Sequence, residues 1–404
     1  MSRLVLLSPF SPSSDGRHGG VRAVRGLAQA LAERHELVLV HIGSNQDLDP
    51  DLTRRCLHVI CVNPPSDSPR TVRLRRTAAL ARGRTVWSAD PATRVIAKEA
   101  RSAARRFKAD IVQAEYGRLG PALAAVGDEP LRIVTIHDPA ASRHSAPRSR
   151  GWRTATAQRL DSRAALREER SALTCVDAAV VFSKEDRDVV EPEAPPTTEV
   201  VVIPLATDIP TEPLSAAGAG PPAIIFVGNF RHPPNVDAAI RLGRSIFPLV
   251  RAMHPEATLE IVGEQPPGQV RELASERVHV TGAVPDLTPL LDRAALVAAP
   301  MATGGGSRVK VLEALAAGKA VVTTSRGAAG LSVPVGEAIT IAEHDEDLAS
   351  AINHLLDDPA ARLRLGRGAR AWAEEALAWS TMAQRYDDLY ARLMEKRSSR
   401  RSGA

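Results

Sequence analysis

Cysteine, aromatic residues and long apolar runs are scarce in this chain of 404 residues. The three cysteines, Cys56, Cys61 and Cys175, are too few and too scattered for a disulfide framework or a zinc site. Phenylalanine, tryptophan and tyrosine make up only 3% of the residues, and no base-stacking, zinc-finger or recognition-helix pattern is present, so nucleic acid is not an expected partner. No apolar run approaches the roughly 18 residues that a membrane-spanning helix needs.

What is abundant is typical of a globular protein with more than one domain. Hydrophobic residues make up 44% of the chain and charged residues 25%, and the length suits two or three domains. The first residues, MSRLVLLSP, contain a short apolar run without a small-residue cleavage site, which favours a β-strand over a signal peptide. With so few cysteines, these features predict a cytoplasmic protein.

Arginine is unevenly distributed, although the net charge is only +5. Residues 70–84 include six arginines and no acidic residue, and a second arginine-rich stretch covers residues 143–170. Such runs usually form a solvated helix face. The alternative is peripheral contact with an anionic surface, either the inner face of a membrane or an acceptor that carries phosphate.

Short β-branched segments alternate with amphipathic helical segments along most of the chain, which predicts parallel sheets built from β-α-β units. Helices are expected over 21–33, 236–249 and 309–317, and from 347 to about 396. Strands are expected over 4–7, 37–41, 58–62, 111–113, 132–136, 179–182, 200–203, 224–227, 259–262, 278–281, 296–299, 320–323 and 338–341.

Proline and glycine accumulate between the two series of strands, which predicts a linker over residues 209–222. The fold class is therefore α/β, with two Rossmann-like, doubly wound parallel-sheet domains. The expected divisions are 1–208 for a first Rossmann-like domain, 223–385 for a second one, and 386–404 for the end of a helix and a basic, disordered tail.

Residues 300–318 (PMATGGGSRVKVLEALAAG) combine a triple-glycine turn with a helix that begins with two cations. A helix N-terminus carries partial positive charge, so Arg308 and Lys310 are unfavourable there unless an anion binds. Free backbone N–H groups beside glycine suit a phosphate or diphosphate. Glu313, one turn after Lys310 and on the same helix face, would reach hydroxyls attached to that anion. The segment therefore predicts a sugar-nucleotide site.

The second half of the chain resembles the nucleotide-binding domain of GT-B glycosyltransferases, in particular the retaining family 4. The resemblance rests on the order and spacing of FVGNFRHPPN (226–235), LEIVG (259–263), VTGAVPD (280–286), and the 300–318 segment with VVTT (321–324). The first half is similar more weakly, through Gly19-Gly20, IHD (136–138), VFSKEDR (181–187) and IPLATD (203–208). The family has two domains facing across a cleft.

The resemblance implies roles for donor-side residues. Glu313 matches the second glutamate of the family's paired motif, which binds ribose hydroxyls, while Gly305 stands where the family has the first glutamate. Arg231 lies in the loop that usually stabilises the leaving diphosphate, but the usual lysine after it is replaced by a Pro-Pro-Asn run, so Lys310 and Arg308 would share that role. The implied donor-binding residues are Gly228, Arg231, Val284, Gly304, Gly305, Gly306, Ser307, Arg308, Lys310 and Glu313.

On the acceptor side, His137 matches a histidine near the transferred sugar, where it could bind a hydroxyl or assist proton transfer. Glu115 and Asp138 are weaker acceptor-side candidates, and Gly19 and Gly20 would let a helix N-terminus approach the ligand. Each also has a structural alternative: a satisfied polar residue at a strand end, a surface carboxylate, or a tight turn. The implied catalytic residues are His137, Arg231, Lys310 and Glu313.

The resulting hypothesis is a retaining, metal-independent glycosyltransferase that needs no cofactor and moves a sugar from a nucleotide-diphosphate sugar to a hydroxyl acceptor. No metal site is expected, because the alternating Asp47, Asp49 and Asp51 resemble a surface loop. Gly305 and the altered first loop motivate a second hypothesis, a catalytically weakened nucleotide-sugar-binding or scaffold protein. An epimerase or phosphorylase of the same fold ranks last, since no pyridoxal-binding lysine motif is present.

Overall fold

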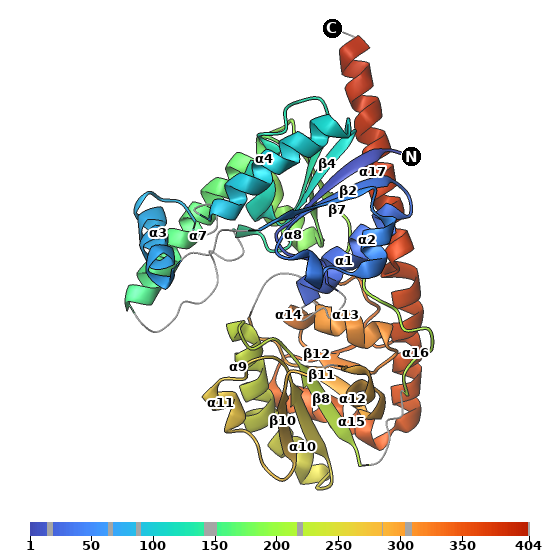
Figure 1. The fold of residues 1–404 in the computed structure, drawn as a ribbon. Helices are drawn as coiled ribbons and strands as arrows, with labels where there is room; N and C mark the ends of the chain where they lie inside the picture. Colours follow the sequence, from blue (N-terminus) through green and yellow to red (C-terminus); the bar gives the residue numbers. More distant parts are fainter. Residues whose placement is uncertain are drawn as a thin grey trace. The chain divides into compact units, whose positions relative to one another are not determined.

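Two compact units, each built around its own parallel sheet, make up this chain in the computed structural model (Figure 1). Unit 1 contains Met1–Leu205 and Trp379–Ala404, and unit 2 contains Ala206–Gly304 and Arg308–Ala378. The structure describes residues 1–13, 19–63, 68–85, 90–140, 152–215, 221–284, 286–303 and 309–402.

The sheet of unit 1 has, in the described residues, seven parallel strands in the order β3-β2-β1-β4-β5-β6-β7. The order reverses between β1 and β4, and ligands of such sheets bind beyond the carboxyl ends of the strands at this reversal. The strands are β1 (Arg3–Ser8), β2 (Glu36–Ile42), β3 (His58–Val62), β4 (Ile111–Glu115), β5 (Leu131–Thr135), β6 (Ala178–Val181) and β7 (Glu199–Val202).

Alternate residues of these strands face opposite helical layers, because successive side chains of a strand point to opposite faces. Val5 and Leu7 pack in one cluster with Ile96 and Ala100 of α4 (Pro91–Arg106). Asp90 begins α4 by accepting a 2.9 Å hydrogen bond from the Ala92 amide. The other helices before residue 205 are α1 (Gly19–Ala32), α2 (Pro50–Arg55), α3 (Pro69–Ala81), α5 (Gly120–Leu123), α7 (Trp152–Leu173) and α8 (Lys184–Val190).

The last helix, α17 (Trp379–Ser402), belongs to unit 1 although it ends the chain. It packs beside α1 so closely that a Cβ on Gly26 would lie 2.1 Å from the Trp379 ring. Its buried side chains recur every three or four residues, with Tyr386, Leu389, Tyr390 and Leu393 on one face. The sequence predicted a domain boundary at residue 385, a helix that ends near residue 396, and a basic, disordered tail after that. In the structure the helix continues to Ser402, although the last buried apolar side chain of this face is Leu393.

Unit 2 has, in its described part, six parallel strands in the order β10-β9-β8-β11-β12-β13, with the reversal between β8 and β11. Its strands are β8 (Ala223–Val227), β9 (Thr258–Val262), β10 (Val278–Gly282), β11 (Leu296–Ala299), β12 (Val321–Thr323) and β13 (Thr340–Ile341). Its helices are α9 (Pro233–Arg241), α10 (Phe247–Met253), α11 (Gly268–Arg271), α12 (Thr288–Arg293), α13 (Val309–Ala316), α14 (Ser325–Ala328), α15 (Asp345–Asp357) and α16 (Pro359–Ala376), with a π-helical turn (Leu242–Ile246) between α9 and α10.

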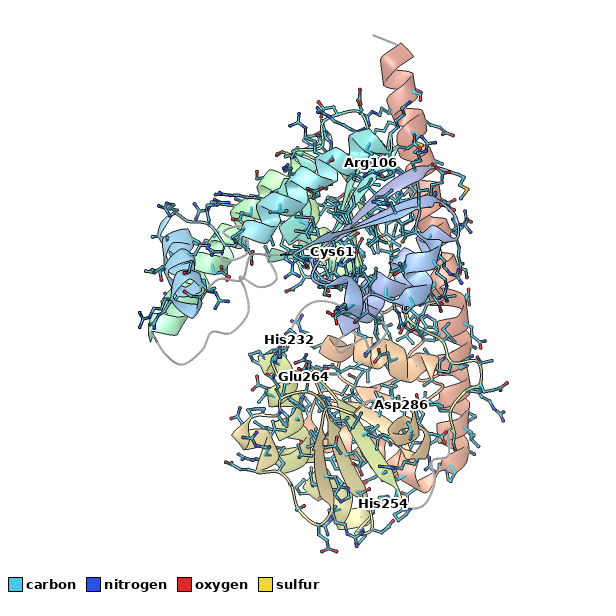
Figure 2. All side chains as sticks on the ribbon, viewed as in Figure 1. Cys61, Arg106, His232, His254, Glu264 and Asp286 are labelled. Carbon is cyan, nitrogen blue, oxygen red and sulfur yellow. The ribbon has the colours of Figure 1, made fainter. Side chains whose placement is uncertain are left out.

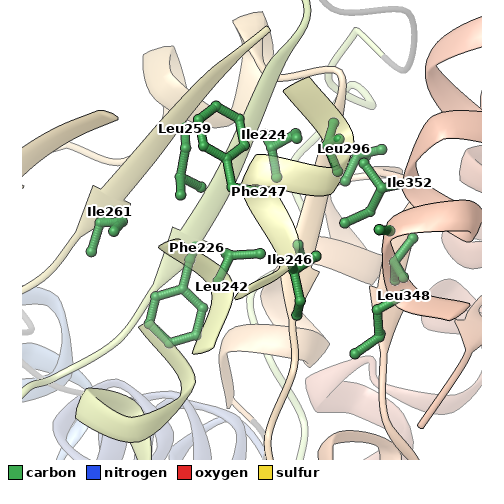
Figure 3. Close-up of a cluster of buried hydrophobic side chains, with 14 of the residues drawn as sticks. Ile224, Phe226, Leu242, Ile246, Phe247, Leu259, Ile261, Leu296, Leu348 and Ile352 are labelled. Atoms are coloured by element: carbon green, nitrogen blue, oxygen red, sulfur yellow. The ribbon is translucent and has the colours of Figure 1, made fainter. Parts of the chain in front are cut away.

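One buried apolar cluster holds the β8, β9 and β11 face of this sheet against its helices (Figure 3). Phe226 and Leu259 come from neighbouring strands, while Phe247 and Ile352 come from α10 and α15. All four are at most 2% exposed. Burial of this kind stabilises the fold by about 1.5–3 kcal/mol for each large side chain.

Residues 206–215, which the sequence had predicted to belong mostly to a linker, are hydrogen-bonded within unit 2. The Leu214 amide donates to the Ala317 carbonyl at 2.9 Å, and the Arg370 guanidinium donates to the Pro210 carbonyl at 2.6 Å. The fully buried Lys319 ammonium donates to the carbonyls of Ser215 and Ala294, the latter at 2.6 Å. The segment is therefore fixed to unit 2, because its polar backbone groups find partners there.

The sequence located the strands well. Every strand expected from the sequence coincides with one of β1 to β13, and no end differs by more than two residues. The helix expected over 236–249 lies within the continuous run from α9 to α10. Among the described residues, no helix is both long enough and apolar enough to cross a membrane.

Lys319 predicts a specific dependence of stability on pH. Burial lowers the pKa of its ammonium from 10.5 to about 8. Between these values the unfolded chain binds the proton and the folded chain does not, so stability rises with pH across this window. We expect the stability difference between wild type and Lys319→Met to shift by about 2 kcal/mol in favour of wild type from pH 7 to pH 10. Urea unfolding at both pH values measures it, and a pH-independent difference would contradict the burial effect.

Candidate functional site

Two candidate residues of unit 2, Gly228 and Arg231, lie in the loop after β8, beside the strand reversal. Gly228 follows β8, and its amide donates to the Val262 carbonyl at 2.9 Å. Three residues on, Arg231 is largely exposed and pairs with Glu264 at 3.3 Å and with the Gln265 amide oxygen at 3.1 Å. Figure 2 shows His232 and Glu264, from the loops after β8 and β9, close together at this end of the sheet.

Two glycines let these loops touch. A Cβ on Gly263 would lie only 1.7 Å from the Gly228 carbonyl oxygen, and the φ of Gly263 is +156°. A Cβ on Gly228 would lie 3.1 Å from the Asn235 and Phe226 side chains. The glycines of these two motifs therefore serve close backbone packing, which positions the Arg231 loop.

Lys310, at the start of α13, contacts the first turn of α9. Its ammonium donates to the Asn235 amide oxygen, lies 3.7 Å from the Met301 sulfur, and lies 5.5 Å from the centre of the Phe226 ring. The Asn235 amide nitrogen in turn donates to the Asn229 carbonyl at 2.8 Å. Asn235 belongs to the Pro-Pro-Asn run that the sequence expected in place of a lysine, and it accepts a hydrogen bond from a lysine of another segment.

Glu313 lies one helical turn after Lys310, and both are half-buried at the border of the buried face of α13. Val284 is half-buried in the loop after β10, where it packs against an apolar cluster. Two threonines hold the chain just after β11: Thr323 Oγ1 donates to the Ala299 carbonyl and Thr324 Oγ1 to the Met301 carbonyl, both at 2.6 Å. Five residues predicted for the donor lie outside the described residues: Gly304, Gly305, Gly306, Ser307 and Arg308.

In unit 1, a buried carboxylate lies at the carboxyl end of β4. Glu115 is 1% exposed, and its Oε1 accepts hydrogen bonds of 2.8 Å from the Gln113 amide and from the Thr135 hydroxyl. Its Oε2 accepts a 2.8 Å bond from His137 Nε2. Glu115 and Thr135 are in register on neighbouring strands, so the sheet itself brings these groups together.

The ring of His137 is held on both sides. It stacks on Tyr116 with the ring centres 3.8 Å apart and 5° between the planes, and it meets Phe182 edge-on at 4.8 Å. Because a carboxylate has no proton to donate, Nε2 carries the proton of the bond to Glu115. In the neutral ring this leaves Nδ1 as an acceptor, and in the described part of the chain Nδ1 has no hydrogen-bond partner.

Tyr116 adopts an unusual backbone conformation to make this stack. Its φ is +72°, a region that residues other than glycine rarely occupy and that costs about 1–3 kcal/mol. Burial raises the pKa of its hydroxyl to about 12. Strain of this kind gathers at functional sites, where the surrounding structure enforces it.

The other acceptor-side candidates are Asp138, Gly19 and Gly20. Asp138 is half-buried directly after His137. Gly19 and Gly20 are half-buried and begin α1, the helix that follows β1. The amide of Ala140 donates to both carboxylate oxygens of Glu169, at 3.2 and 3.0 Å, which fixes the chain after His137.

Two of the aspartates that the sequence did not favour as metal ligands have structural partners. Asp49 caps α2 by accepting from the Asp51 and Leu52 amides, and Asp51 pairs with Arg54. Within the ranges that the structure describes, no group of three histidine, cysteine or acidic side chains is arranged to hold a metal ion.

Sequence reasoning missed Gln113, Thr135 and Asn235, which hold the predicted residues in place. Gln113 stands two residues before Glu115 on the same face of β4, and Thr135 ends β5 two residues before His137. A polar residue at a core position of a central strand was the available signal, because buried polar groups need partners. Asn235 was noted only as a departure from a family motif.

Comparisons with known proteins identify relatives of this chain. A family model described as Glycosyl transferases group 1 matches residues 221–358. The glycogen synthase of Mycobacterium tuberculosis is 30% identical over 314 residues, which cover 73% of this chain and 71% of that protein.

Two solved structures share the fold. Sucrose-phosphate synthase from Thermosynechococcus elongatus aligns with a TM-score of 0.75 at 18% identity, over 98% of this chain and all of that one. Anabaena Alr3699/HepE, in complex with UDP and glucose, aligns with a TM-score of 0.66 at 15% identity, over 97% of this chain and all of that one. Both units of this chain therefore take part in the shared GT-B architecture.

Proposed function

The chain belongs to the Glycosyl transferases group 1 family and is a glycosyltransferase, and we propose that its donor is a nucleotide-diphosphate sugar bound by unit 2. One observation carries the proposal. The strand reversal of unit 2 brings the Arg231 loop and the Lys310 end of α13 to one edge, where Asn235 links them. Two cations beside a helix start suit a diphosphate. The solved relative with UDP and glucose supports a donor of this class.

In the proposed reaction the sugar keeps its anomeric configuration. The bond between the anomeric carbon and the diphosphate oxygen breaks, and the acceptor hydroxyl forms the new bond from the same face. The departing diphosphate takes the acceptor's proton, so no protein base is required. Arg231 and Lys310 stabilise the negative charge that develops on the leaving group. Since these side chains supply that positive charge, we propose that no metal ion or other cofactor is needed.

Glu313 and the backbone around it hold the nucleoside end of the donor in this proposal. A carboxylate accepts hydrogen bonds from both hydroxyls of a ribose. Glu313 follows Lys310 by three residues on α13, which is the spacing of neighbours on one helix face. Gly228 and Val284 border the same edge from the loops after β8 and β10.

Unit 1 supplies the acceptor-side groups. His137 presents Nδ1 as an acceptor for a hydroxyl of the sugar or of the incoming acceptor, because Glu115 holds its Nε2 proton. Asp138, which follows His137 in the chain, and Gly19 and Gly20, which begin α1, are the further acceptor-side residues in this proposal. The acceptor class is a hydroxyl of a glycan, a lipid-linked molecule or a small molecule.

Two substitutions in α13 test the donor site. We expect Lys310→Ala to lower kcat by about 10²–10³-fold, because a charge-stabilising group is lost from the transition state. We expect Glu313→Ala to weaken donor binding about tenfold, because hydrogen bonds to the ribose are lost.

A thermal-shift screen of UDP-, GDP-, ADP- and dTDP-sugars first identifies the donor. Calorimetry and release of nucleoside diphosphate, both with a chelator present, then measure the two effects.

Arg251→Ala is the matched control, because Arg251 is an exposed cation near the end of α10, which leads to the amino end of β9, whereas the donor-side loops follow the carboxyl ends of the strands. It should change neither quantity. Unchanged turnover and affinity in both α13 variants would refute the donor site, and loss of activity on chelation would refute metal independence. Donor binding by the wild-type chain without release of nucleoside diphosphate across a broad acceptor panel would favour the alternative, a nucleotide-sugar-binding or scaffold protein.

We also propose that the arginine-rich helix α3 contacts an anionic membrane surface at the cytoplasmic face. Arg70, Arg73 and Arg76 are exposed on it, and Leu74 between them is 72% exposed. Four residues after α3, the Thr85 hydroxyl donates to Glu168 of α7 at 2.6 Å, which attaches the chain there to α7. Each basic residue near an anionic surface contributes about 1 kcal/mol to binding.

Vesicle co-sedimentation tests this contact. Binding to phosphatidylglycerol-containing vesicles should fall at least tenfold in Arg73→Glu/Arg76→Glu, because attraction becomes repulsion, and it should fall in high salt. Arg251→Glu, the same charge reversal on α10, should bind as the wild type does. Equal binding of wild type and the double variant would contradict the proposal.

A further inference from the structure

All three tyrosines of this chain lie around the buried carboxylate of Glu115. Tyr116 follows it and stacks on His137. The other two come from α17, at the far end of the sequence. The Tyr390 hydroxyl donates to the Gln113 side-chain oxygen at 2.5 Å, and the Tyr386 hydroxyl lies 3.3 Å from Thr135 Oγ1. The last helix of the chain is thereby joined to the acceptor-side histidine.

The hydrogen bonds of this network all run from the tyrosines of α17 toward Glu115. Tyr390 donates to the Gln113 oxygen, which turns the amide nitrogen of Gln113 toward Glu115 at 2.8 Å. The opposite orientation of the amide would place its oxygen against the carboxylate, and two acceptors repel each other. Thr135 gives its single proton to Glu115 at 2.8 Å, so Tyr386 donates to Thr135. Every donor therefore points toward Glu115.

Both tyrosines of α17 are buried, which keeps their hydroxyls in the protonated, donating form. Tyr386 is fully buried and Tyr390 is 2% exposed. Burial raises the pKa of both hydroxyls well above the usual value, and the nearby charge of Glu115 acts in the same direction. Both shifts favour the protonated hydroxyl, which is the form that donates these hydrogen bonds.

Docking of α17 does not require these hydroxyls, because other contacts attach the helix. Arg34 Nε donates to Asp387 at 2.5 Å and His35 Nε2 lies 2.7 Å from the same carboxylate. Trp379 packs into the space that Gly26 leaves on α1. A phenylalanine would fill the place of either tyrosine, so apolar packing alone does not explain a buried hydroxyl.

We propose that Tyr390 is a positioning residue for His137, which it orients through Gln113 and Glu115. The chain of donors fixes which Glu115 oxygen is left for His137 Nε2, and so fixes the ring and the direction of Nδ1. Tyr386 supports the same carboxylate through Thr135. This inference rests on the proposed function, in which His137 binds a hydroxyl during transfer.

A double-mutant cycle on the full chain tests the inference. We expect Tyr390→Phe to lower kcat about tenfold with the KM for the donor unchanged, because only the ring orientation of His137 is lost. His137→Ala should lower kcat by about 10²-fold or more. The double variant should be no slower than His137→Ala alone, because Tyr390 then has nothing to position. Tyr386→Phe should show a smaller loss, since its hydrogen bond is longer.

Asp387→Asn is the matched control on the same helix. It weakens the contacts of α17 with Arg34 and His35 and leaves Gln113 untouched, so it should lower the melting temperature without lowering kcat at a temperature where the protein is folded. A merely structural Tyr390 would behave like this control.

The outcomes distinguish the role proposed for His137 from the positioning role proposed for Tyr390. If His137→Ala retains wild-type kcat, the role proposed for His137 fails. If His137→Ala is impaired but Tyr390→Phe is not, or if the two losses multiply in the double variant, the positioning role of Tyr390 is overturned while that of His137 stands. Should Tyr390→Phe fold poorly, the same cycle with Tyr386→Phe decides in the same way.

Discussion

The arrangement of this molecule depends on where strand order reverses in its two parallel sheets. Because the strands on either side of a reversal send their helices to opposite faces, the loops after them leave an open edge where groups from several segments meet. In unit 2 this edge gathers the loop after β8 and the start of α13. In unit 1 the candidate residues follow β4 and β5, beside the reversal between β1 and β4. Each sheet thereby collects polar residues that the sequence keeps far apart.

The two sheet edges differ in the charge that they carry and in how that charge is paired. At the edge of unit 2, positive charge is held ready: Arg231 pairs with Glu264, and Lys310 with the neutral Asn235. An arriving diphosphate can exchange these partners for stronger ones, since charged hydrogen bonds to phosphate are short and strong. At the edge of unit 1, a buried carboxylate is satisfied by donors and in turn orients one histidine. A half-satisfied network there would be costly, which explains why tyrosines from the last helix complete it.

The fold was largely predictable from sequence, because β-branched runs and helical periodicity are local signals. The strand at 296–299 and the helix from residue 309 appear where the pattern places them. What escaped prediction depends on tertiary contacts. The assignment of α17 to unit 1 follows from its packing against α1, and residues 206–215 are fixed by the distant Lys319. Lys310 and His137 were proposed from their places at a helix start and after a strand end, but the contacts of Lys310 with Asn235 and of His137 with Glu115 are visible only once the chain is folded.

Hydrogen exchange on the full chain, with and without the nucleoside diphosphate that stabilises it most, tests the central claim most directly. The claim is that the reversal between β8 and β11 forms the donor site. It predicts slower exchange in the peptides that contain residues 228–232 and 309–313, with Lys310→Ala losing this protection, because bound phosphate shields these backbone amides. Protection confined to other peptides, or protection of these two that survives in the variant, would contradict the account.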